Sequence, residues 1–83
     1  MSPVKAVDVL RILAQGRAGT TMCPSDVARA LEPRDWRALM PGVRRAALEL
    51  VDAGQADILQ RGRVVDGRTA RGPIRIRERP TET

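Results

Sequence analysis

The arginines of the last third of the chain are the residues whose type and spacing could do chemistry. In "RGPIRIRERP", residues 71–80, an arginine occupies nearly every second position. Residues 61–83 hold seven arginines against three carboxylates, whereas residues 1–60 hold eight basic and seven acidic side chains. A localised basic strip of this kind is typical of a surface that contacts phosphates. GC-rich codon usage is the alternative explanation, because fourteen of the fifteen basic residues are arginine in a chain rich in Ala, Gly, Val and Pro.

Catalytic and metal-binding chemistry have little support in the composition. The chain has no histidine, and Cys23 is its single cysteine, so four soft metal ligands cannot be assembled and we expect neither a metal nor a cofactor. General acid–base work would fall to carboxylates. The four candidates each suit a cap, a helix surface or a strand face, and they are Asp26, Asp35, Asp52 and Asp57. No glycine-rich loop links a strand to a helix. We therefore expect no enzyme, and we interpret Cys23 as a small buried hydrophobe rather than a redox sensor.

Length and composition predict one small domain. Eighty-three residues with 42% hydrophobic content suffice for a single core, which we place in residues 1–79, with 80–83 as a disordered tail. A lone cysteine forms no internal disulfide, so nothing requires an oxidising compartment. No run approaches the roughly 20 apolar residues of a membrane span, and the N-terminus lacks the apolar core of a signal peptide. A cytoplasmic protein without membrane association is the expectation.

The first amphipathic segment predicts a helix from Pro3 to Gln15. Ser2 suits the N-cap, and Pro3 suits the first helical position because its missing N–H would be unpaired there anyway. Gly16 is expected to adopt the left-handed conformation that ends many helices. Helical spacing assigns the inner face to Val7, Leu10, Leu13 and Ala14.

Two further helical segments follow. Pro24 to Leu31 predicts a short second helix that Pro33 prevents from continuing. The third begins with Asp35 as N-cap, and Pro41 is expected to divide it into a single turn and a main helix that ends before Gly54. The predicted bounds are Asp35–Leu39 for the turn and Pro41–Ala53 for the main helix. The expected inner faces are Val27, Ala28 and Leu31, then Val43, Ala46, Ala47, Leu50 and Val51.

The apolar period changes from helical to alternating after Gly54. Ala56–Gln60 and Pro73–Arg77 read as two strands that can pair, and "TTM" at residues 20–22 suits a short third strand. Residues 61–72 contain three glycines and four arginines, which predicts a long, protruding hairpin loop. In the last strand Ile74 and Ile76 share one face, so the alternating Arg75 and Arg77 are expected to be solvated or to protect a sheet edge.

The order of these elements is that of a winged helix-turn-helix: a mainly α fold with a small β-sheet, in which a three-helix core has a short strand between helices 1 and 2 and a β-hairpin wing. In that arrangement the third helix enters a major groove and the wing reaches the adjacent backbone. The expected nucleic-acid-binding residues are therefore Arg44, Arg45, Arg61, Arg63, Arg68, Arg71 and Ser25.

Four runs of the sequence, "TTMCPSDVARAL", "DWRALMPGVRRAA", "QRGRVVD" and "ARGPIRIR", carry a resemblance that extends from about Leu10 to Arg77. They resemble a small bacterial family of about this length, which is classed among the domains of unknown function and treated as winged-helix-like. The resemblance implies the fold and supplies no substrate or catalytic residue.

We favour a nucleic-acid-binding module, with DNA as the expected partner, that makes phosphate contacts with little sequence readout. The third helix is electrically neutral, since Arg44 and Arg45 are balanced by Glu49 and Asp52, and it has no Asn or Gln to pair with adenine. Trp36 is interpreted as a packing anchor rather than a platform for a base.

A second interpretation stays open. The same fold could be a protein-interaction module that docks a partner on Leu48 and the neutral face of the third helix, without binding DNA. The sequence does not determine the oligomeric state.

Overall fold

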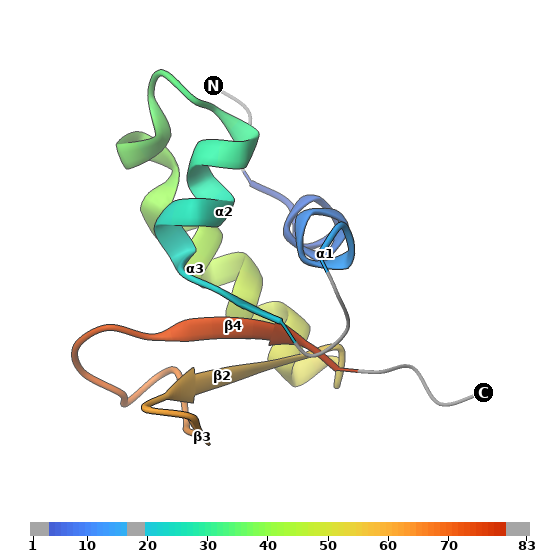
Figure 1. Ribbon diagram of the computed structural model, residues 1–83, viewed down its shortest axis with the longest axis vertical. Coiled ribbons are helices and arrows are strands. Elements are labelled where there is room, and N and C mark those ends of the chain that lie inside the picture. The colour runs from blue at the N-terminus through green and yellow to red at the C-terminus, as the bar shows by residue number, and fades with distance from the viewer. Residues whose placement is uncertain (1–3, 17–19, 80–83) are drawn as a thin grey trace.

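The computed structural model describes residues 4–16 and 20–79 (Figure 1). Over these residues the chain forms three helices and four strands, which makes it a small mixed α/β domain. None of the described helices is long and apolar enough to cross a membrane. The elements are α1 (Ala6–Ala14), β1 (Thr21–Met22), α2 (Pro24–Leu31), α3 (Trp36–Asp52), β2 (Ala56–Gln60), β3 (Arg63–Val64) and β4 (Arg75–Glu78).

The four strands form one antiparallel sheet in the order β1-β4-β2-β3. The last strand of the chain is therefore an inner strand, with Ile76 opposite Met22 of β1 on one side and opposite Ile58 of β2 on the other. In Figure 1 the helices lie above the sheet, and the β2–β3 hairpin lies at the lower left. The predicted pairing of the two long strands is confirmed, because β2 and β4 are neighbours.

One aliphatic core joins the helices to the inner face of the sheet, as a chain with a single aromatic residue requires. Its largest fully buried side chains come from all three helices and both long strands, and they are Leu50, Ile58, Ile76, Val9, Val27 and Val43. Ile76 of β4 and Ile74, one residue before this strand, are both buried as the alternation predicted.

Helix α1 begins three residues later than predicted. Val4 and Lys5 lie outside it, and Lys5 is the N-cap with an extended backbone, its N–H donating to the Asp8 carboxylate at 3.2 Å. The predicted N-cap Ser2 and the predicted first helical residue Pro3 lie outside the described residues. Gly16 does not have the positive φ that was expected, because Gln15 ends the helix in a right-handed conformation.

The buried face of α1 also differs from the prediction. Val7, assigned to the core, is 52% exposed, whereas Val9 is completely buried. Almost every position of this segment is apolar. Two apolar stripes therefore fit the helical period equally well: the predicted one and the one formed by Ala6, Val9, Leu10 and Leu13. Packing against α3 buries the second.

Helix α2 and strand β2 have the predicted bounds, but α3 does not stop at Pro41. Asp35 is its N-cap as predicted, although its carboxylate makes no capping hydrogen bond. The helix then continues unbroken from Trp36 to Asp52 with Pro41 inside it. Proline removes one backbone hydrogen bond at a cost of about 3 kcal/mol. Apolar side chains on both sides of it, Leu39, Met40 and Val43, pack into the core and offset this loss.

The segment 61–72 is not one protruding loop. Arg61 and Gly62 form a two-residue turn with φ values of 54° and 80°, the type I′ pattern that suits a tight hairpin. Strand β3 follows, and the Val65 N–H then donates to the Ile58 carbonyl oxygen at 2.9 Å. Residues 65–70 fold back towards α3, with Gly67 so close to Leu48 and Ile58 that a Cβ there would come within 3.0 Å of each. Strand β4 starts at residue 75 instead of 73 and includes Glu78.

Candidate nucleic-acid interface

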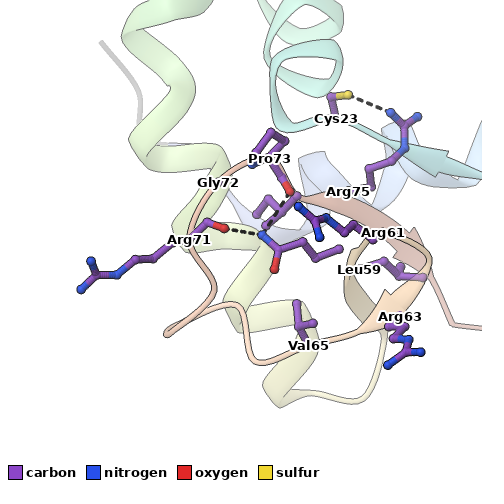
Figure 2. A pocket seen from close by; sticks show the side chains of 11 residues that line it. Cys23, Leu59, Arg61, Arg63, Val65, Arg71, Gly72, Pro73 and Arg75 are labelled. Carbon is purple, nitrogen blue, oxygen red and sulfur yellow. Dashed lines mark hydrogen bonds between the residues drawn. The ribbon is translucent and has the colours of Figure 1, made fainter.

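An open cleft of about 990 Å³ lies between the β2–β3 hairpin and the segment that returns to β4 (Figure 2). Four arginines line it, and no carboxylate does. They are Arg61, Arg63, Arg71 and Arg75. The lining also includes apolar side chains from β2 and from the return segment, which are Leu59, Val65, Pro73 and Ile74. The four arginines are exposed, whereas Leu59 and Ile74 are buried and Val65 is half-buried, and these three apolar residues are called the floor of the cleft.

Arg61 holds the central position in this cleft. Figure 2 shows its guanidinium between the return segment and the Leu59 side of the lining. The residue stands at the first central position of the hairpin turn with φ of 54°. For a long side chain this left-handed conformation costs roughly 1 kcal/mol, whereas asparagine or glycine adopt it readily. The hairpin therefore carries a guanidinium where the backbone alone would favour a different residue.

Arg63 and Arg71 stand at the rim. Both are exposed, and Figure 2 shows the Arg71 side chain extending away from the floor. The Gln60 side-chain amide donates to the carbonyl oxygens of Arg71 and Pro73, the second at 3.4 Å, and so fixes the return segment beside β2. Within the described ranges neither arginine forms an ion pair.

Arg75 reaches the other side of the cleft and ties β4 to β1. Its guanidinium donates to the Thr21 hydroxyl at 2.5 Å, to the Thr21 carbonyl oxygen at 3.0 Å and to the Cys23 sulfur at 3.0 Å. On the same face Arg77 pairs with Asp57 at 3.0 Å. Arg75 is exposed, as the solvated alternative of the prediction had it, whereas Arg77 is half-buried in its ion pair. The other alternative, protection of a sheet edge, is wrong because β4 lies between β1 and β2.

Arg68 does not reach the cleft. Its two terminal nitrogens donate to the two carboxylate oxygens of Asp52 at 3.1 and 2.6 Å, which clips residues 65–70 to the end of α3. The hydrogen bond from Arg68 holds the pKa of the Asp52 carboxyl below its usual 3.8, and the same bond raises the pKa of Arg68. A guanidinium held in this way is a poorer phosphate ligand than its neighbours.

Replacing Asp52 by asparagine should remove the acid-sensitive ion pair between Arg68 and residue 52. Because the pKa of Asp52 is lower in the folded protein than in the unfolded chain, the pair stabilises the fold above pH ~4 and loses this contribution as the pH falls through the lowered pKa. The Arg68 Nε–H signal, followed by NMR from pH 6 to pH 2, should shift in the wild type and shift much less in Asp52→Asn, where only the weaker influence of the Asp66 charge remains. Asp66→Asn is the control, since the Asp66 carboxylate accepts the Arg68 backbone N–H and not its guanidinium. A titration that disappears in the control but persists in Asp52→Asn would contradict the assignment.

The remaining predicted contacts lie outside the cleft. Arg45 donates to the Val4 carbonyl oxygen at 3.2 Å and so holds the N-terminal segment against α3. Arg44 is exposed, and Ser25 is half-buried in the first turn of α2. The structure thus brings together Arg61, Arg63 and Arg71 but leaves Arg44, Arg45, Arg68 and Ser25 elsewhere. Sequence reasoning missed Arg75, because it could not show that β4 lies beside β1.

Trp36 is covered by cations. The guanidinium carbons of Arg29 and Arg37 lie 4.3 and 4.6 Å from the centre of its ring, a distance at which cation–π attraction operates. The ring is half-buried and packs against the core. Across residues 4–16 and 20–79 no three His, Cys, Asp or Glu side chains are grouped to hold a metal ion.

A family model described as "Protein of unknown function (DUF3253)" matches residues 4–79, nearly the whole of the chain. No curated protein matches it.

Proposed function

The chain belongs to this family of unknown function, and we propose that it is a nucleic-acid-binding module that holds the phosphate backbone at its arginine-lined cleft. The observation that carries the proposal is a lining with four guanidiniums and no carboxylate. A concave surface of one charge sign concentrates ligands of the opposite sign. Guanidiniums are also the protein groups best suited to the oxygens of a phosphate.

The arrangement of elements supports a winged helix-turn-helix mode of action, with DNA as the expected partner. Three helices precede a β2–β3 hairpin, and this hairpin and the return segment carry the cleft arginines, as a wing would. The main departure from the usual mode concerns α3. Its outer face holds Arg44, but one turn later Leu48 packs against Gly67 of the folded-back segment. Contacts from the wing side therefore carry more of the binding than insertion of α3 does.

The proposed contacts read charge rather than sequence. Arg45 is engaged with Val4, Arg68 with Asp52, and Arg75 with Thr21 and Cys23. The exposed guanidiniums that would contact phosphates are then Arg44, Arg61, Arg63 and Arg71. Contacts of this kind position a protein on nucleic acid without distinguishing bases.

The dependence of affinity on salt tests this proposal. Each phosphate contact with a duplex contributes about −0.9 to the slope of log affinity against log salt, so four contacts should give a slope of about −3.6. The measurement is fluorescence anisotropy with a labelled duplex of mixed sequence between about 50 and 200 mM NaCl, repeated with a second, unrelated sequence. Equal slopes and affinities on both are expected. No binding at the lowest salt concentration, or binding that ignores salt, would refute the proposal.

The protein-docking interpretation has less support from the structure. It depended on Leu48 as an exposed apolar residue of α3, and Leu48 is half-buried against residues 65–70. If the purified domain ignored both duplexes and bound one protein stoichiometrically, this alternative would replace the nucleic-acid proposal.

A further inference from the structure

The floor of the cleft is apolar, and a phosphate backbone gives it no partner. Leu59 and Ile74 are 5% and 8% exposed, and half-buried Val65 lies beside them in the lining. In a duplex the flat faces of the bases are stacked inside, and only base edges are exposed in the grooves between the sugar–phosphate backbones. Contact with duplex backbone would thus satisfy the rim arginines and give no partner to the small apolar surface that these three side chains still expose.

The size of the cleft is that of a site for a small organic molecule. Its volume of about 990 Å³ is at the upper end of the roughly 300–1,000 Å³ typical of sites that enclose small organic molecules. A nucleotide whose base has left the stack is such a molecule: it has a flat, largely apolar base and a charged phosphate at one side. Unstacked bases of this kind occur in single strands, loops and ends.

The arginines are arranged to suit a strand that passes through the cleft. Arg61 is central, and Figure 2 shows Arg71 and Arg63 directed outward at separate parts of the rim. A guanidinium plane can stack on a base as well as bind phosphate. No aromatic side chain lines the cleft, so Arg61 can provide the stacking surface instead. The aromatic residue that the chain does have, Trp36, is already covered by Arg29 and Arg37.

Insertion of a helix into a duplex is hindered on the same molecule. Residues 65–70 lie against α3, held by the contact of Gly67 with Leu48 and by the two hydrogen bonds from Arg68 to Asp52. The face of α3 that carries Leu48 and Asp52 is thus occupied by this segment and is not free to enter a major groove. A single strand in the cleft does not need this face.

We propose that the cleft binds single-stranded nucleic acid, with one base against Leu59, Val65 and Ile74, the Arg61 guanidinium stacked over it, and the flanking phosphates on Arg63 and Arg71. This inference rests on the proposed function, of which it names the ligand class. Base stacking on a protein side chain favours an unpaired base over one held in a duplex. We therefore expect a labelled single strand of about 12 nucleotides to bind about tenfold more tightly than the same strand annealed to its complement.

Arg61→Asn tests the site without disturbing the turn. Asparagine followed by Gly62 is a preferred pair for a type I′ hairpin, so the variant should unfold at the same temperature as the wild type or a higher one. It should lose the preference for the single strand, so that the two affinities become equal within about twofold. Arg11→Asn is the control, because it removes the same charge from an exposed position of α1 and should leave the preference for the single strand unchanged.

The results of this experiment distinguish failure of the single-strand inference from failure of the proposed function. Equal or tighter binding of the duplex by the wild type overturns the single-strand inference and leaves the proposed function standing. A single-strand preference that survives Arg61→Asn overturns the assignment to this cleft. Failure of both probes to bind at low salt overturns the proposed function, and the inference with it.

Discussion

The triple variant Arg61→Gln, Arg63→Gln, Arg71→Gln should bind duplex DNA at least about a hundredfold more weakly than the wild type at roughly 0.1 M salt. At that concentration each lost phosphate contact removes about 0.9 log units of affinity, and three would remove about 2.7. The slope of log affinity against log salt should fall from about −3.6 to about −0.9, since Arg44 alone would remain. Anisotropy titrations over a range of salt concentrations measure both quantities.

A matched control variant shows whether the loss of affinity comes from the cleft or from the lower net charge. Arg11→Gln, Arg34→Gln, Arg37→Gln removes the same three charges from exposed positions on α1, the α2–α3 loop and α3. None of the three lines the cleft. It should lower the affinity less than about fivefold, because charges away from the bound phosphates act only through the screened field of the whole protein. Equal losses in the two variants would mean that DNA is attracted by overall charge and that the cleft has no special part in binding.

Ile76→Ala should destabilise the fold more than any of the arginine substitutions. Ile76 is fully buried on the inner strand β4, between Met22 of β1 and Ile58 of β2. Truncating a buried isoleucine to alanine costs about 2–5 kcal/mol, through lost transfer free energy and the cavity left behind. A domain of this length has roughly 4–12 kcal/mol of total stability. A large part of it should therefore disappear in a urea unfolding experiment at room temperature.

Ile76→Val provides the graded comparison. It removes one methylene from the same site and should lower the free energy of unfolding by about 0.5–1.5 kcal/mol. The two values together identify the cause as lost packing. If alanine and valine were equally mild, β4 would not be the inner strand on which the sheet depends.

The sequence predicted the elements whose signals are local and unambiguous. Helix α2 has Pro24 at its start and Pro33 just beyond its end, and its two bounds are correct. Strand β2 follows Gly54, whose φ of 74° ends α3 as expected. Alternation placed Ile74 and Ile76 on the buried face. In each case residues within a few positions of each other determine the result.

The errors arose where tertiary packing decides between local alternatives. The apolar residues of α1 offer two possible stripes, and contact with the rest of the core makes Val9 the buried residue instead of Val7. A proline inside a helix is disfavoured locally, yet packing on both sides of Pro41 keeps α3 continuous. Neither outcome can be read from a single segment.

Only part of the candidate site was predicted, because the rest depends on tertiary packing. Composition identified residues 61–71 as arginine-rich, and Arg61, Arg63 and Arg71 do line the cleft. The pairing of Arg68 with Asp52, 16 positions away, and the apolar floor under Arg61 depend on how residues 65–72 fold back. No periodicity in that segment indicates this path.

The inner position of β4 has a consequence for how the protein is made. Thr21 and Arg75, 54 positions apart, are joined by side-chain hydrogen bonds, and β1 and β2 have no contact in the sheet except through β4. Contacts between such distant residues slow folding. On the ribosome the helices can collapse early, but the sheet cannot close until residues 75–78 have left the exit tunnel, so the cleft should be among the last features of the nascent chain to form.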